Sequence, residues 1–175
     1  MWHARTRLRL TSLLAAVLWA VPAVAASRFD PGLRFRSVAT GHFTIYFHRG
    51  EERLAARVAR IAEDVRRRLE PTLGVPRQPR IHVVLADQSE LSNGWATPLP
   101  YNTIAIYPAS PSGSELIGNT DDWLQLVFAH EYTHIVHLDR SRGWSRIVRG
   151  VFGRTPLAFP NLFLPVWQIE GLATF

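Results

Sequence analysis

Two histidines stand four positions apart, with a glutamate directly after the first, in the pattern His130-Glu131-Tyr132-Thr133-His134. On an α-helix, residues i and i+4 differ by about 40° in direction and lie one turn apart, so both imidazoles can reach one metal ion. Glu131 points about 100° away from His130, where it is poorly placed as a ligand but well placed to act on a water molecule at that ion. The spacing therefore predicts a two-histidine metal site with Glu131 as general base.

The chain around this pattern has the composition of a buried helix. Gly118 and Gly143 bracket a stretch without internal Pro or Gly, and Asp122 near its start suits the positive end of a helix dipole. Apolar residues fall on nearly every face of the stretch, which indicates burial all round and leaves the charged Glu131 in need of a partner. A buried cation accounts for the glutamate and both histidines together. The alternative is an ordinary core helix with two hydrogen-bonded histidines.

A catalytic zinc ion usually has three protein ligands and one open position, so a third ligand is expected. After Asp139 the chain contains no histidine and a single acidic residue, Glu170. His137 stands about 10 Å further along the helix axis than His130, and Asp139 faces away from the ligand side, so both are weaker candidates. A metzincin would carry Gly and His where this chain has His137 and Arg140, which disfavours that family.

Glu170 lies within residues 167–173, which read WQIEGLA. At this point the chain resembles the gluzincin zinc metallopeptidases, whose signature is the two-histidine helix followed by a glutamate on a second helix. The form W-x-x-E-G-x-A is similar to that of the aminopeptidase N family and of bacterial peptidase-MA-like domains, and the loop between the motifs is more like that of the second group. The resemblance implies that His130, His134 and Glu170 bind Zn2+ and that Glu131 is the general base.

The resemblance also implies an α+β, zincin-like fold in which a small mixed sheet places an edge strand over a pair of active-site helices. The implied activity is zinc-dependent hydrolysis of a peptide or protein substrate. Thermolysin-like relatives have Asp four residues after the glutamate ligand, where this chain has Thr174, so the hydrogen-bond partner of a ligand histidine is not supplied. The alternative is a non-catalytic zincin fold that serves as a binding module of a larger cell-envelope protein; the intact ligand set and Glu131 argue against it.

Upstream of the motif, the sequence predicts a strand at 42–48, an amphipathic helix at 51–70 and a short buried strand at 81–86, the order of a right-handed βαβ unit. Turn-forming residues then occupy 87–100, and a third strand is predicted at 103–107. The resemblance makes this third strand the edge above the zinc ion, where its free N–H and C=O groups can hold an extended peptide. An ordinary antiparallel edge strand is the alternative.

The N-terminus has the pattern of a secretory signal peptide. Three arginines precede an apolar run from Leu13 to Val24, and the small residues Ala23-Val24-Ala25 form a cleavage site. We expect residues 1–25 to be the signal peptide of a periplasmic or extracellular protein, with a retained membrane anchor as the alternative. Residues 26–175 are then the metallopeptidase domain. We expect this domain to be incomplete at its C-terminal end, because the second active-site helix stops five residues after its glutamate.

The charge of the chain gives little support for nucleic-acid binding. Removing residues 1–25 takes away three of the 20 Arg residues and leaves 17 against 14 acidic residues, too small a difference for a phosphate-tracking surface. Five of these arginines lie in residues 140–154, which contain no acid and have apolar residues at helical spacing. The interpretation that the sequence favours is a helix packed over the metal site, and contact of residues 140–154 with an anionic membrane surface is the alternative.

The signal-peptide interpretation predicts a mature N-terminus close to Ala25. N-terminal sequencing of the exported protein should find a chain that begins within a few residues of this position. A membrane-bound form that still begins with Met1 or Trp2 would contradict cleavage and favour the retained anchor.

Overall fold

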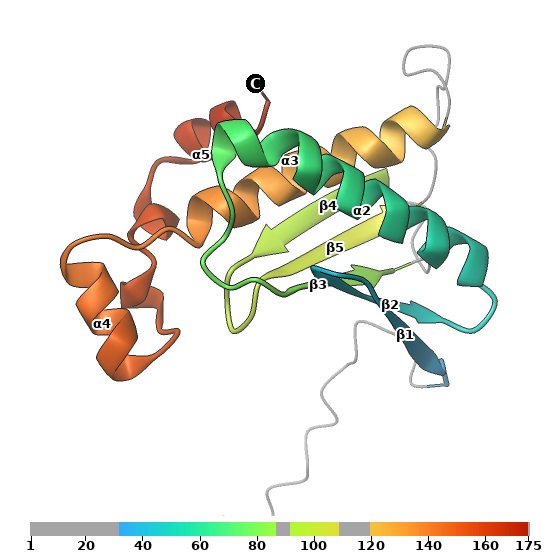
Figure 1. Ribbon diagram of the computed structural model, residues 1–175, viewed down its shortest axis with the longest axis horizontal. Coiled ribbons are helices and arrows are strands. Elements are labelled where there is room, and N and C mark those ends of the chain that lie inside the picture. Colours follow the sequence, from blue (N-terminus) through green and yellow to red (C-terminus); the bar gives the residue numbers. More distant parts are fainter. Residues whose placement is uncertain (1–31, 87–91, 109–119, 175) are drawn as a thin grey trace, which may run out of the picture. The chain divides into compact units, whose positions relative to one another are not determined.

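A five-stranded mixed sheet runs through the part of the chain that the computed structural model describes, residues 32–86, 92–108 and 120–174 (Figure 1). The strands are β1 (Phe35–Ala39), β2 (Phe43–His48), β3 (Ile81–Leu85), β4 (Ser92–Thr97) and β5 (Thr103–Pro108), in the spatial order β1-β2-β3-β5-β4. The three central strands are parallel, and β1 and β4 pair antiparallel at the two edges. Each edge strand therefore presents one row of backbone groups that no other described strand pairs.

Helices cover this sheet on one face. Over the described ranges the chain forms four α-helices and two short 3-10 helices: α2 (Glu52–Leu73), α3 (Thr120–Leu138), α4 (Trp144–Phe152), η1 (Pro156–Ala158), η2 (Pro160–Phe163) and α5 (Val166–Ala173). The long helices α2 and α3 contact each other and lie on the same face of the sheet (Figure 1). The described chain is thus a mixed α+β structure. None of its helices is long and apolar enough to cross a membrane.

The core forms where alternating strand residues meet the apolar sides of α2 and α3. In β2, Phe43, Ile45 and Phe47 are buried and the residues between them are partly exposed, as expected of a strand with one covered face. The ring of Phe43 meets that of Phe128 in α3 edge to face, with 5.6 Å between the ring centroids. The strand–helix–strand order predicted for residues 42–86 is confirmed, with β2 and β3 as parallel neighbours.

The third predicted strand is confirmed as β5, but its predicted place at the edge is wrong. β5 lies between β3 and β4, and β4 is the edge strand, although residues 87–100 carry turn formers. Six residue pairs join β4 to β5, with Trp95 opposite Ala105, and β4 also packs against α3. These contacts outweigh the weak strand propensity of Asn93 and Gly94.

Asp139, directly after α3, is fully buried and joins several segments of the chain. Its Oδ1 accepts hydrogen bonds from Arg149 Nη2 at 2.8 Å and from Arg154 Nη1 at 3.1 Å. Its Oδ2 accepts hydrogen bonds from the backbone N–H of Gln78 at 2.9 Å and from Asn102 Nδ2 at 3.1 Å. One carboxylate therefore holds the end of α3 against the segments that precede β3 and β5 and against α4.

These contacts decide which side of α4 faces the body. Because Arg149 turns inward to Asp139, the polar edge of α4 packs against the protein. α4 contacts η1, and none of its residues line the hollows around His130 and His134. The favoured interpretation of residues 140–154, a helix packed over the metal site, is therefore wrong.

The role of Asp139 predicts a large loss of stability in Asp139→Ala. This change leaves Arg149 and Arg154 largely buried without their counter-ion, and breaking a buried ion pair costs about 3–5 kcal/mol in the free energy of unfolding. Asp64→Ala is the matched control, because the pairs of Asp64 with Arg67 and Arg68 are on the surface and should cost less than about 1 kcal/mol. Urea denaturation measures both. Equal losses in the two variants would contradict the role of Asp139.

Candidate metal centre

Three side chains predicted as ligands converge in the structure. His130 Nε2 lies 3.0 Å from His134 Nε2 and 3.3 Å from Glu170 Oε2, and the distance from His134 Nε2 to Glu170 Oε2 is 3.5 Å. Ligands in tetrahedral positions at 2.0–2.1 Å from a zinc ion stand roughly 3.3 Å apart, which these distances match closely. The chemistry of the donor set, two imidazoles and one carboxylate, is also that of a zinc site. His130, His134 and Glu170 can therefore hold a zinc ion together.

Two helices supply these ligands. His130 and His134 lie one turn apart on α3, with their rings perpendicular at a centroid distance of 4.6 Å. Glu170 comes from α5, which packs against α3. The segment that precedes α5 is held against α3 by Asn161 in η2, whose Nδ2 donates a hydrogen bond to the backbone C=O of His137 at 2.7 Å. Sequence reasoning had no signal for this role of Asn161.

The two weaker ligand candidates lie outside this group of three. Asp139 uses both carboxylate oxygens for Arg149, Arg154 and its other donors. His137 is buried, and burial lowers the pKa of its imidazole. Neither Asp139 nor His137 is therefore part of the candidate ligand group.

Glu131 is buried beside the edge strand β4. A Cβ atom added to Gly94 of β4 would lie 2.8 Å from Glu131 Cγ, 2.9 Å from Glu131 Oε1 and 2.9 Å from Val127 Cγ1, distances that no real side chain adopts. A larger residue at position 94 would therefore require β4 or these side chains of α3 to shift. The sequence did not indicate this contact, because a glycine beside an asparagine, as at Gly94, is typical of a turn.

Burial governs the protonation of the groups in this site. It raises the pKa of Glu131 to about 7, and the nearby carboxylate of Glu170 adds to the increase. A divalent cation at the ligand group would act in the opposite direction. Burial, followed by the neighbouring His130, lowers the pKa of His134 and so favours the neutral imidazole, which is the form that binds a metal ion.

The second ring nitrogen of His134, Nδ1, is buried and has no hydrogen-bond partner among the described residues, and the same holds for Nδ1 of His137. Thr174 does not pair with His134, because its hydroxyl donates to the backbone C=O of Glu170 at 2.9 Å.

Two hollows border the ligand group and share Asn93, Gly94 and Glu131. The larger, of about 880 Å³, is bordered by His130 and has mostly apolar walls: Leu69, Leu73, Leu126, Val127, Ala129, Leu172 and Ala173. The smaller, of about 350 Å³, is bordered by Trp95, Ala96, His134, Leu138, Ile169 and Glu170. The candidate ligands and Glu131 thus lie where both hollows meet the edge strand.

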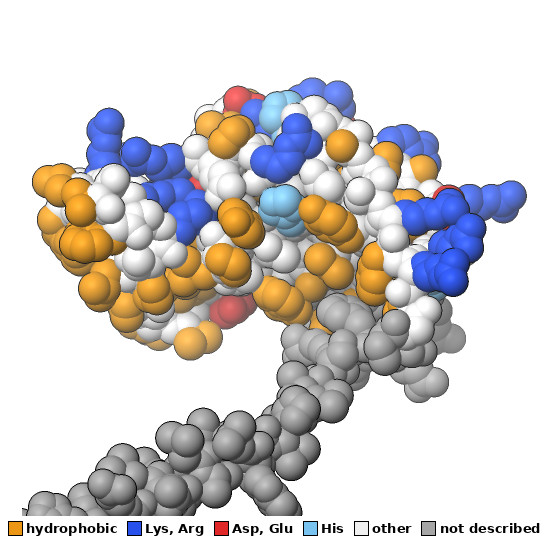
Figure 2. Space-filling view, turned by 90° about the horizontal axis from the view of Figure 1, so that it is seen from below, with side chains coloured by type: hydrophobic (Ala, Val, Ile, Leu, Met, Phe, Trp, Pro, Cys, Tyr) orange, Lys and Arg blue, Asp and Glu red, His pale blue; other side chains and the backbone are white. Residues whose placement is uncertain are grey.

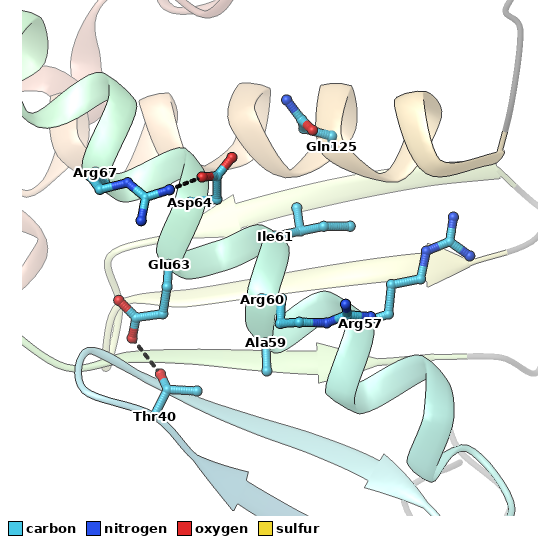
Figure 3. A pocket seen from close by; sticks show the side chains of 9 residues that line it. All are labelled: Thr40, Arg57, Ala59, Arg60, Ile61, Glu63, Asp64, Arg67 and Gln125. Atoms are coloured by element: carbon cyan, nitrogen blue, oxygen red, sulfur yellow. Dashed lines mark hydrogen bonds and ion pairs between the residues drawn. The ribbon is translucent and has the colours of Figure 1, made fainter.

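A third hollow, of about 890 Å³, opens on α2 and shares no residue with the other two (Figure 3). Both of its acidic side chains bond to their neighbours: Asp64 pairs with Arg67, and Glu63 accepts a hydrogen bond from the Thr40 hydroxyl at 2.6 Å. Such pairs are typical of a solvated helix surface rather than of a reactive centre.

Models of known protein families, curated proteins and solved structures contain no match to this chain. The function of the chain must therefore be inferred from the residues of the candidate site and their geometry.

The contact between Gly94 and Glu131 predicts that Gly94→Ala lowers the free energy of unfolding. Overpacking of this kind costs about 1–3 kcal/mol, because β4 or the Glu131 side chain must move. Gly150→Ala in α4 is the control: a Cβ there meets nothing within 4 Å, and alanine favours a helix by roughly 0.5–1 kcal/mol over glycine. Urea denaturation of both variants is the measurement. A Gly94→Ala protein as stable as the wild type would show that β4 does not press on Glu131.

Proposed function

We propose that this protein is an exported, zinc-dependent metallopeptidase with a zincin-like fold of the gluzincin type. The observation that carries the proposal is the convergence of His130, His134 and Glu170 from two helices, at distances that fit one zinc ion, next to the buried carboxylate of Glu131. A metal site that served structure alone would need no additional buried carboxylate beside its ligands. Such a carboxylate is what a hydrolase needs as a base.

Each residue has a distinct role in this proposal. His130, His134 and Glu170 would hold the ion. Zinc, when bound, supplies a Lewis acid that polarises the scissile carbonyl and makes water more acidic. Glu131 takes a proton from the attacking water at its carboxylate and later delivers it to the nitrogen of the leaving amine, so that the peptide C–N bond breaks without a free amide anion.

The edge strand and the hollows support a peptide as substrate. β4, rather than residues 103–107, has backbone groups along one side that no other described strand pairs, and an extended peptide can add to them by main-chain hydrogen bonds. The larger hollow beside His130 suits an apolar substrate side chain, because leucines line much of its wall. We therefore propose that the substrate lies along β4, with its scissile bond next to Glu131.

Substitutions of Glu131 and Glu170 distinguish the proposed base from a proposed ligand. Glu131→Gln keeps all three ligands and removes the proton acceptor, so zinc content should stay at the wild-type level while peptide hydrolysis falls by about 10² to 10⁴. Glu170→Ala removes a ligand, so zinc content and thermal stability should both fall. The measurements are zinc per chain, melting temperature and the rate of hydrolysis of an unstructured protein such as casein.

Glu52 provides the controls, because it is an exposed glutamate at the start of α2. Glu52→Gln and Glu52→Ala should leave zinc content and hydrolysis unchanged. Full zinc content and activity in Glu170→Ala would remove Glu170 from the ligand set. A wild-type protein that binds zinc but hydrolyses no peptide would instead favour the non-catalytic binding module.

A further inference from the structure

The short helix α4 packs on the protein by its polar edge and exposes its apolar side. Ser145 is buried, and its hydroxyl donates to the backbone C=O of Arg142 at 2.8 Å. The Arg149 side chain is also almost fully buried, and it donates to Asp139 Oδ1 at 2.8 Å and to the Asp139 backbone C=O at 2.9 Å. These polar contacts hold α4 in an orientation opposite to that of an ordinary amphipathic surface helix.

The apolar side chains of α4 therefore lie in solvent. Trp144, Ile147 and Val151 are spaced by three and four residues, which places them on one side of the helix, and Phe152 extends this surface. Their exposed fractions are 61%, 68%, 70% and 69%. We name these four residues the α4 stripe. Four large apolar side chains exposed on a nine-residue helix are more than a solvated surface explains, and such patches mark interaction sites.

The apolar surface continues beyond α4. Leu157 in η1, Phe163 in η2, and Val166 and Trp167 in α5 are also exposed. Figure 2 shows hydrophobic side chains over the lobe at the left, where Figure 1 places α4, with Arg side chains at the margin of that lobe. The α4 stripe is thus part of a broader apolar face with arginine side chains along one margin.

The charged residues between Asp139 and Glu170 are all arginines. The sequence contains no Asp or Glu between Asp139 and Glu170. Asp139 neutralises Arg149 and Arg154, whereas Arg142 and Arg146 are exposed and form no ion pair with an acid of the described chain. The stripe is therefore bordered by uncompensated cations near the N-terminal end of α4.

We propose that the α4 stripe docks peripherally on an anionic lipid membrane surface. Such a surface offers an apolar layer for the stripe, and anionic headgroups above it for Arg142 and Arg146. Trp144 suits the boundary between these layers, since its ring is apolar and its N–H is polar. A second copy of the chain fits less well, because a two-fold contact would bring the stripe's cationic borders from both copies into one interface with no acid to balance them.

The test is sedimentation of the whole chain with lipid vesicles, and it does not depend on peptidase activity. Vesicles of phosphatidylglycerol and phosphatidylcholine in equal parts should bind the protein, with binding that weakens as salt is raised, and vesicles of phosphatidylcholine alone should bind it less. The double change Ile147→Glu and Val151→Glu should lower the partition coefficient on the anionic vesicles by about a hundred-fold or more. Arg142→Gln and Arg146→Gln should each lower it by about five-fold.

The matched controls lie on other surfaces. Val75→Glu changes an exposed apolar residue after α2, and Arg60→Gln removes an exposed arginine of α2, so neither should alter binding to vesicles. The apolar run near the N-terminus is the same in every variant, so binding through that run would be unaffected by the changes in α4 and would overturn the proposal. Absence of binding to anionic vesicles would also overturn it, as would concentration-dependent dimers that the double change at Ile147 and Val151 abolishes without any vesicle binding.

Discussion

The burial of α3 is the constraint on which the rest of the structure depends. Four ionisable residues of this helix and of the position directly after it are buried: Glu131, His134, His137 and Asp139. A buried ionisable group must be paired, coordinated or neutralised. Directly after the helix, Asp139 receives two arginines and two neutral donors. Within the helix, the described residues leave Nδ1 of His134 and Nδ1 of His137 without a hydrogen-bond partner, and Glu131 has a strongly raised pKa. The polar network around Asp139 is therefore satisfied by the protein itself, whereas the histidines and the glutamate of α3 are not fully satisfied.

Much of the fold follows from periodicity. The alternation in β2 and β3 and the apolar side of α2 are local signals that tertiary structure reinforces, so the strand–helix–strand order could be predicted. The position of His130 and His134 on one side of α3 could be predicted for the same reason, because the spacing of residues i and i+4 has a fixed meaning once a helix is established. Glu170 is far away in sequence, and two features pointed to it: the small number of acidic residues in that region, and the resemblance of residues 167–173 to the second gluzincin motif.

The edge strand could not be predicted, and the reason is physical. Asn93 and Gly94 have weak strand propensity, and in a single sequence a glycine needed for a close approach looks the same as a glycine in a turn. The contact of Gly94 with Glu131 becomes visible only when β4 and α3 are both in place. The orientation of α4 was missed for a related reason. Helical spacing shows which residues share a side of a helix, whereas the partner of Arg149 decides which side faces inward.

The position of α5 links the metal site to the stability of the fold. α5 has eight residues, many of them exposed, and a helix of that length is marginal without tertiary contacts. Its contacts are with α3, and the hydrogen bond from Asn161 to the His137 backbone fixes the segment that leads to it. An ion held by His130, His134 and Glu170 would join α5 to α3 directly, so part of its binding free energy would appear as stabilisation of this helix pair. The three residues proposed as zinc ligands would therefore also complete the packing of α5 on α3.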